Sequence, residues 1–249
     1  MNNNIKALLK DLAFIFIFFM VFTTFGWQSF HIPSGSMEPT LEVGDRIFVS
    51  KFTYGYNRYS VPFDPEFIGE GKVFERTPER GDVIVFSLPY MGNVDFIKRL
   101  VGLPGDHIQM IEGKLYLNDT LVKRTFIRNV TYTDYNGIPR IAKEYEEELP
   151  SSNGGDPITH RIYHHTYEKD PTTDTTQLYI VPEGKVFMMG DNRDHSADSR
   201  YLSRMGFVRL EYIVGTAAVT TFSLFDCDQG KDIFCPAGVP LGRFFNWID

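Results

Sequence analysis

The chain has 249 residues, of which 43% are hydrophobic and 15% are aromatic. This apolar content is enough for a folded core and excludes global disorder, and the aromatic share favours strands over a helical bundle. A net charge of -7 argues against a nucleic-acid partner, because sequence-independent binding to nucleic acid needs a basic surface. Two cysteines are too few for a disulfide-stapled scaffold or a four-cysteine metal cage.

The N-terminal region contains an apolar run, Leu12 to Phe30, without a charged residue. As a helix this run would be about 28 Å long, close to the hydrocarbon thickness of a bilayer. A cleaved signal peptide and a buried core helix are the alternatives. Thr23–Trp27 is too bulky for a signal-peptide cleavage site, and the extreme terminus of a chain is a poor place for a core helix. The sequence therefore predicts one transmembrane helix over residues 12–30.

The charges beside this run predict its orientation. Lys6 and Lys10 precede it, and positively charged residues tend to stay on the cytoplasmic side of a membrane. Residues 1–11 are therefore predicted to be cytoplasmic, and residues 31–249 to form an extracytoplasmic domain. Trp27 is expected near the outer interface.

The two cysteines, Cys227 and Cys235, flank a predicted turn. An extracytoplasmic position permits a disulfide between them, which would contribute roughly 2–3 kcal/mol by closing a small loop. Two free thiols are the alternative.

Beyond residue 30, short apolar or alternating runs are separated by glycine, proline and aspartate, a pattern typical of strands. The clearest runs are Arg46–Val49, Asp82–Phe86, His107–Ile111, Lys114–Leu117, Leu178–Val181, Val186–Met189 and Thr216–Thr220. Glu112–Lys114 predicts a hairpin turn. The fold class is therefore mainly β, with an antiparallel, barrel-like domain.

Two polar stretches interrupt this pattern. Residues 55–80 contain several prolines and glycines and are predicted to form a surface loop. Residues 125–176 are predicted to be an inserted β-hairpin extension with a mobile tip. The acidic run at residues 144–148 within it is interpreted as a solvated face.

The loop that follows the apolar run, Ile32–Leu41, has an unusual composition. Pro33 and Pro39 restrict the backbone and remove two donors, and Gly35 permits a sharp bend or a close approach of another segment. Ser36 is sterically open there, but a serine hydroxyl is a weak nucleophile without a base.

Lys98 is the candidate base because it lies in the apolar stretch Phe96–Val101. Burial would lower its pKa from about 10.4 towards about 8, at a cost of roughly 3 kcal/mol. A solvent-facing lysine and an ordinary turn serine are the alternatives. A further segment, Gly190–Arg200, is rich in aspartate and arginine, and by itself would be interpreted as a surface ion-pair network.

Taken together and in this order, the segments resemble bacterial type I signal peptidases of the S26 family. The matching patterns are Ser-Gly-Ser-Met-x-Pro-Thr-Leu from Ser34, Lys-Arg-x-Val-Gly-Leu-Pro-Gly-Asp from Lys98, and Gly-Asp-Asn-Arg-Asp-x-Ser-x-Asp-Ser-Arg from Gly190. The family consists of membrane-anchored Ser/Lys endopeptidases that cut signal peptides from exported preproteins at the outer face of the inner, or plasma, membrane. The resemblance covers the predicted anchor and nearly all of the domain that follows, and it is weakest across the stretches 55–80 and 125–176.

The resemblance implies a role for each matching residue. Ser36 would be the nucleophile and Lys98 the general base, with the Ser34 hydroxyl and the Ser36 backbone N–H forming the oxyanion hole. Ser196 would orient the Lys98 amine. A supporting network would pair Asp191 with Arg99, and Asp198 with Arg200 or Arg193.

The resemblance also implies the substrate and its pockets. The signal peptide would bind as an extended strand, with small side chains fitting shallow pockets and an Ala-x-Ala-like motif before the cut. The pocket residues that match are Phe30, Ile32, Met37, Leu41, Val85, Phe96 and Ile97. Preproteins and membrane lipid are the expected partners, and no metal or cofactor is implied.

Histidines offer competing interpretations that we do not favour. His195 adjoins Ser196 and suggests a Ser-His pair. In the family that the chain resembles, however, the position of the general base matches Lys98 of this chain. His160, His164 and His165 have helix-like spacing for a metal but lack an accompanying HExxH glutamate. Two other functions stay open: a specialised Ser/Lys maturation peptidase, and a non-enzymatic anchored β domain that binds export partners.

Overall fold

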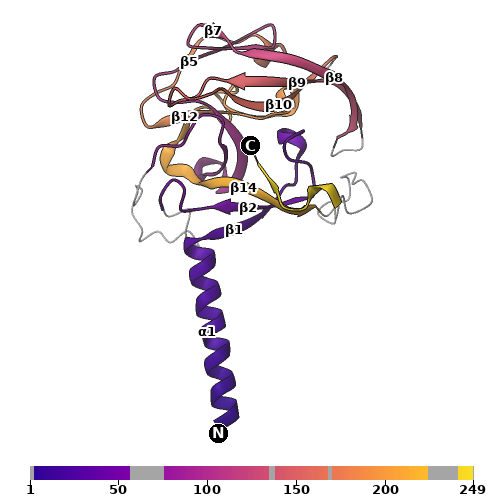
Figure 1. Cartoon of the computed structure of the whole chain (residues 1–249). Helices are drawn as coiled ribbons and strands as arrows, with labels where there is room; N and C mark the ends of the chain where they lie inside the picture. The colour runs from indigo at the N-terminus through magenta and orange to yellow at the C-terminus, as the bar shows by residue number, and fades with distance from the viewer. Residues whose placement is uncertain (1–2, 57–75, 135–137, 168–169, 224–240, 249) are drawn as a thin grey trace.

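The computed structural model describes residues 3–56, 76–134, 138–167, 170–223 and 241–248 (Figure 1). The stretch predicted to be a loop at 55–80 lies largely outside these residues, as do Cys227 and Cys235. The helical elements are α1 (Asn3–Phe25), η1 (Gly35–Met37), η3 (Pro89–Met91), α2 (Pro171–Asp174), η4 (Arg193–His195), η5 (Leu210–Tyr212) and η6 (Leu241–Arg243).

Antiparallel strands dominate from residue 27 onwards, as the sequence predicts. The largest sheet has the order β1-β2-β14-β3-β4-β12-β13, and β15 pairs with β14. Its strands are β1 (Trp27–His31), β2 (Asp45–Ser50), β3 (Val83–Leu88), β4 (Val94–Gly102), β12 (Lys185–Met189), β13 (Val208–Arg209), β14 (Ile213–Ser223) and β15 (Asn246–Trp247). The expected barrel-like closure is not seen among the described strands, because β1 pairs only with β2 and β13 only with β12.

Two smaller sheets complete the strand architecture. One has the order β11-β5-β6-β7 and the other β10-β9-β8. Their strands are β5 (His107–Ile111), β6 (Lys114–Leu117), β7 (Thr120–Leu121), β8 (Lys123–Thr133), β9 (Pro139–Leu149), β10 (Ile158–His165) and β11 (Tyr179–Ile180). The predicted turn is confirmed, since Glu112 and Gly113 join β5 to β6 with φ of 49° and 69°. Each of the seven runs singled out in the sequence contains a strand or part of one, although β11 covers only Tyr179 and Ile180 of the run Leu178–Val181.

The predicted hairpin extension is a three-stranded sheet that packs on the rest of the domain. Tyr163 of β10 bridges to Asn192, and β10 lies against η4. The acidic run on β9 is solvated only in part: Glu146 is exposed, but Glu144 and Glu147 are only 0% and 1% exposed. Burial of these carboxylates is possible because arginines pair with them, and one of these, Arg193, comes from η4.

The core is divided into three apolar clusters. One joins the β5–β6 hairpin to Phe187, and a second surrounds Phe86 and Leu100 in the middle of the large sheet. The third lies under the loop after β1 and contains Met37 and Leu41. This third cluster supports the segment in which the candidate nucleophile lies.

The N-terminal helix differs from the one predicted over residues 12–30. It runs over Asn3–Phe25, and Trp27–His31 pair with β2 as β1, from Trp27 opposite Ser50 to His31 opposite Arg46. The chain is tied to the large sheet at this point, because Lys51 N donates to Gly26 O at 3.1 Å. Within the described part of the chain, we find no helix with both the length and the apolar character needed to cross a membrane.

Candidate active site

Ser36 and Lys98 meet at the centre of the candidate site. The turn η1, directly after β1, presents Ser36 half-buried, and Lys98 projects from β4. Lys98 Nζ lies 2.7 Å from Ser36 Oγ and donates to the carbonyl oxygen of Ile97 at 2.9 Å. Residues 62 positions apart in the sequence are thereby brought within hydrogen-bond distance.

The environment of Lys98 favours its neutral form. The side chain is only 4% exposed, and burial lowers the pKa of Lys98 to about 8, although the carboxylates of Asp198 and Asp191 act in the opposite direction. An amine with a pKa of about 8 is unprotonated in about a tenth of the molecules at pH 7 and in about half of them at pH 8. It can therefore accept a proton from the adjacent hydroxyl.

Ser34 and Ser196 lie beside this pair with different contacts. Ser34 Oγ is 3.5 Å from Ser36 Oγ. Ser196 Oγ is buried and makes no hydrogen bond with the described residues, so the expected bond to Lys98 is not formed. Both serines line a cavity of about 380 Å³ together with Gly35, Ser36, Phe96, Lys98, Asp194, His195, Ala197, Tyr201 and Arg204.

A buried ion pair fixes the strand that carries Lys98. Arg99 Nε and Nη2 each donate to Asp191 at 2.9 Å, and both side chains are almost fully buried. Thr40 Oγ1 also donates to Asp191, at 2.5 Å. Although burial by itself would raise it, the pKa of Asp191 is held below its usual range, chiefly by Arg99. The pairing matches the sequence expectation, and it joins β4 to the segment after β12 and to the loop after Ser36.

A second ion pair holds the segment after β12. Arg200 donates to both carboxylate oxygens of Asp198 at 2.8 Å, and Gly190 N donates to Asp198 at 3.0 Å. The alternative partner, Arg193, instead forms a bidentate pair with Glu147 of β9. Burial opposes ionisation of Glu147, but Arg193 outweighs it and keeps the pKa of this carboxyl well below its usual range.

Sequence reasoning missed the contacts that tie the β8–β10 sheet to the loop of Ser36. Asn192 N donates to Ser36 O at 3.2 Å, and its side-chain amide donates to Gly35 O at 3.0 Å. The same amide donates to Tyr132 Oη of β8 at 2.8 Å and to Glu38 at 3.3 Å. Asn192 was visible inside the Gly190–Arg200 motif, but no signal in the sequence pointed to Tyr132.

The predicted substrate-pocket residues are mostly brought together. Phe96 is the exception, because it stacks on Phe86 in the neighbouring cluster with ring centroids 6.0 Å apart. The other six belong to one apolar cluster, the one beneath Ser36: Phe30, Ile32, Met37, Leu41, Val85 and Ile97.

The histidines occupy other positions. His195 lines the 380 Å³ cavity, but Lys98 is the titratable group within 2.7 Å of Ser36 Oγ. His160 Nε2 lies 3.4 Å from Glu147, and His164 Nδ1 lies 2.9 Å from Asp194. Within the described residues no group of three acidic, histidine or cysteine side chains is arranged to hold a metal.

Gly190 allows the loop of Ser36 and the segment after β12 to approach closely, and Gly190→Ala is expected to lower the free energy of unfolding by about 1–3 kcal/mol. A Cβ at this position would lie 2.5 Å from Ser36 O and would also overlap the Ser196 side chain. Urea denaturation followed by circular dichroism measures the effect. Gly155→Ala is the matched control, since the nearest atom to its new Cβ is 3.5 Å away. Equal stability of the two variants would contradict the close approach.

The comparisons with known proteins show the family of the chain. The family model described as "Signal peptidase, peptidase S26" matches residues 5–222. A signal peptidase I from Rickettsia akari is 40% identical over 229 residues, covering 89% of this chain and 81% of the relative. One from Rickettsia prowazekii is 38% identical over 225 residues, covering 89% and 82%. A crystal structure of a signal peptidase I from Enterococcus faecalis V583 aligns with 57% of this chain and 97% of its own, at 27% identity and a TM-score of 0.31. On the family match and the two sequence relatives, the chain belongs to the signal peptidase family, peptidase S26, and is a hydrolase of that family.

Proposed function

We propose that this chain removes signal peptides from exported preproteins by cutting after a small-x-small motif, with Ser36 as nucleophile and Lys98 as general base. The observation that carries the proposal is the 2.7 Å approach of a buried lysine amine to a half-exposed serine hydroxyl. Membership of the signal peptidase family supports the substrate class.

The reaction follows from this geometry. Neutral Lys98 takes the proton of Ser36 as Oγ attacks the scissile carbonyl carbon, and the Ser34 hydroxyl with the Ser36 N–H stabilises the resulting oxyanion. The Lys98 ammonium then protonates the leaving amine as the peptide bond breaks, which leaves an acyl ester on Ser36. Water attacks this ester while Lys98 accepts its proton, and the ammonium returns that proton to Ser36 as the signal peptide leaves.

The specificity follows from the apolar cluster beneath Ser36. Its side chains fill the space under the loop, and Met37 and Leu41 are 0% exposed. With this space filled, we expect the surface above the cluster to have only shallow pockets, in which a methyl group fits and a larger side chain would collide. This packing supports a preference for alanine at the two positions read before the cut.

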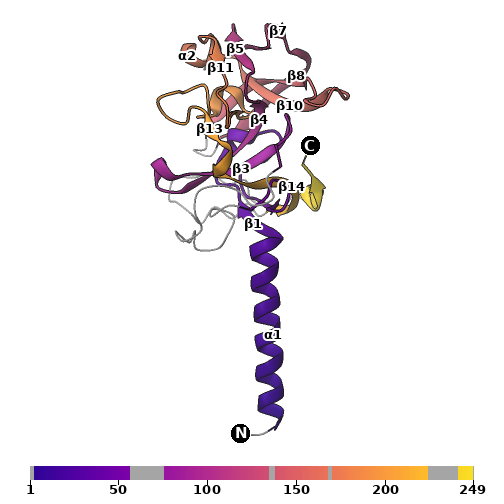
Figure 2. The same cartoon turned by 90° about the vertical axis from the view of Figure 1, so that its left-hand side faces the viewer.

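We further propose that α1 attaches the enzyme to the bacterial inner membrane, with the N-terminus cytoplasmic and the catalytic domain on the outer side. The helix stands clear of the strands in both views (Figures 1 and 2). Large apolar side chains are exposed along it, among them Phe14 at 70% and Phe16 at 64%. Exposed apolar surface of this kind supports contact with lipid, which would confine enzyme and preprotein to one surface and raise their effective concentration.

The test is cleavage of a preprotein with an Ala-x-Ala site by the detergent-solubilised full chain, with the cut located by mass spectrometry. We expect cleavage after the second alanine by the wild type and none by Ser36→Ala. A folded wild-type chain that cuts none of several preproteins would overturn the proposal in favour of a specialised maturation peptidase or a binding protein.

The rate is expected to rise with pH as Lys98 loses its proton. Because burial lowers the pKa of Lys98 to about 8, kcat/KM should increase about tenfold per pH unit below that value and level off above it. The measurement is a pH profile of kcat/KM with a short peptide substrate that carries no titratable group in this range. A profile that is flat between pH 6 and pH 9 would exclude Lys98 as the base.

A further inference from the structure

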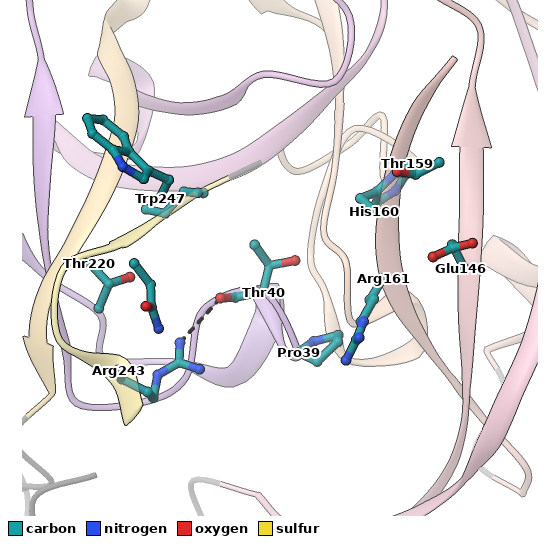
Figure 3. A pocket seen from close by; sticks show the side chains of 11 residues that line it. Pro39, Thr40, Glu146, Thr159, His160, Arg161, Thr220, Arg243 and Trp247 are labelled. Atoms are coloured by element: carbon teal, nitrogen blue, oxygen red, sulfur yellow. Dashed lines mark hydrogen bonds between the residues drawn. The ribbon is translucent and has the colours of Figure 1, made fainter. Parts of the chain in front are cut away.

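A second cleft lies behind the loop of Ser36, between the β8–β10 sheet and the C-terminal strand. Its volume is about 700 Å³, larger than that of the cavity at Ser36 and Lys98. Figure 3 shows β10 with Thr159, His160 and Arg161 on one side and Trp247 and Arg243 on the other. The lining is mainly polar: Pro39, Thr40, Glu146, Thr159, His160, Arg161, Thr220, Arg243, Asn246, Trp247 and Ile248.

One wall of the cleft is an open strand edge. The strand β10 is the outer strand of its sheet and pairs with β9. On its other edge Tyr163 N donates to Asp191 O, and His165 N donates to the Asp194 carboxylate. Backbone N–H groups alternate between the two edges of a strand, so those of Thr159 and Arg161 also point away from β9. No described strand pairs with this part of the edge.

The opposite wall is a second strand edge. Asn246 and Trp247 of β15 pair with Thr220 and Val219 of β14 on one edge only. The other edge has no partner strand among the described residues. The Trp247 side chain is 75% exposed beside this edge. Two strands that each have an unpaired edge therefore line one cleft, and such edges can bind an extended polypeptide through main-chain hydrogen bonds.

The cleft adjoins the catalytic loop. Pro39 and Thr40 line it, and four extended residues span at most about 14 Å, so Ser36 lies within that distance of Thr40. Ile248, which also lines the cleft, packs on the apolar cluster beneath Ser36. The straight-line distance from Ser36 to the cleft is therefore one that roughly five extended residues span.

We propose that this cleft is a second substrate-binding site, which holds an extended polar segment of the preprotein downstream of the cut. The inference rests on the proposed function. The polar lining favours the mature part of the preprotein over the apolar part of a signal peptide. The cations at its rim are already paired, Arg161 with Glu144 and Arg243 with Asp45 and Glu42, so the cleft recognises a polypeptide backbone and not an isolated anion.

Thr159→Pro tests the site because it removes one outward-pointing N–H and leaves the bonds of β10 to β9 in place. Proline is tolerated on the open edge of a strand. Thr159→Ala is the matched control, since it removes the same side chain and keeps the N–H. Each variant is assayed with a full-length preprotein and with a peptide that ends two residues after the cut.

We expect Thr159→Pro to raise KM for the preprotein about tenfold with kcat unchanged, the equivalent of one to two hydrogen bonds. For the short peptide, kcat and KM of Thr159→Pro should stay at wild-type values. Thr159→Ala should keep the wild-type kcat and KM for both substrates. An equal change in KM for both substrates, or an unchanged KM for the preprotein, would overturn the proposal of a second site. Failure of wild type to cut the short peptide would instead contradict the proposed function.

A second measurement covers the case in which Thr159→Pro does not fold. Trp247→Ala should raise KM for the preprotein several-fold and leave the short peptide unaffected. In the Ser36→Ala chain, the fluorescence of Trp247 should change on titration with a polar peptide copied from the mature segment. Absence of both effects would also overturn the proposal.

Discussion

Lys98→Met is expected to lower kcat/KM by about 10⁴-fold and, at the same time, to make the protein more stable. Activity is lost because methionine cannot accept the Ser36 proton. Stability rises because the native fold keeps an amine buried with a pKa of about 8, compared with about 10.4 in an unfolded chain. That difference costs roughly 3 kcal/mol when the amine is protonated, and methionine fills a similar volume without it.

The stability gain should depend on pH in a defined way. Below pH 8 the lysine is protonated in both folded and unfolded chains, so the cost is fully present. Between about pH 8 and pH 10.4 the folded state has released its proton and the unfolded state has not, so wild-type stability rises and the advantage of the variant shrinks. Lys98→Met also loses the hydrogen bonds of the amine. After these are subtracted, we expect its free energy of unfolding to exceed that of wild type by about 1–3 kcal/mol at pH 7.

Denaturant unfolding of wild type and Lys98→Met at pH 7 and pH 10 measures the gain in stability and its pH dependence. Ser36→Ala is the control, because it abolishes cleavage without removing the buried amine. An inactive Lys98→Met that is less stable than wild type at pH 7 would indicate that the amine contributes to folding. Retained cleavage by this variant would point to another base, and His195 would then be the next residue to replace.

Arg99→Met is expected to lower the free energy of unfolding by about 3–5 kcal/mol. Asp191 would remain buried at 1% exposure without the arginine that holds two of its oxygens at 2.9 Å. Arg99 also donates to Gly81 O at 2.6 Å, so the variant leaves an unpaired carbonyl group as well. Few single substitutions outside the apolar core should lower the free energy of unfolding by as much.

The pH dependence and a double variant separate the charge effect from a packing effect. In wild type the lowered pKa of Asp191 contributes stability above about pH 4, the unfolded value, and this contribution is lost as pH falls through the folded pKa. In Arg99→Met, burial raises the pKa of the unpaired Asp191, which then becomes protonated on mild acidification. The difference in the free energy of unfolding between wild type and Arg99→Met should therefore become smaller towards pH 4. Arg99→Met with Asp191→Leu should recover much of the loss, as measured by urea titration. If the single and the double variant lose equal free energy of unfolding, the loss in Arg99→Met arises from packing and not from the unpaired charge of Asp191.

The sequence predicts the local parts of this structure well. Strands such as β3 and β12 are uninterrupted apolar runs between turn residues, and the β5–β6 hairpin is recognisable from its glycine. Pairings between motif residues, such as Asp191 with Arg99, follow from the resemblance to the S26 family. In both cases the information lies in a few neighbouring residues or in a recognisable motif.

The remainder depends on contacts between segments that carry no shared signal. The buried positions of β9 change phase, from Ala142 and Glu144 to Glu147 and Leu149, so its pattern resembles neither a regular strand nor a helix. Burial of Glu147 becomes favourable only because Arg193, 46 residues later, packs against it. The end of α1 at Phe25 was equally hidden, because the uncharged run of the helix continues to Phe30, but Trp27–His31 pair with β2 as a strand.

The contacts of Arg193 and Asn192 have a consequence for how the molecule opens. Removal of the β8–β10 sheet would take Glu147 from Arg193 and Tyr132 from the Asn192 amide. Asn192 N also donates to Ser36 O, so a loosened segment after β12 would lose its hold on the loop of Ser36. We therefore expect local unfolding of the β8–β10 sheet to disturb the loop of Ser36 as well, as in a single cooperative unit.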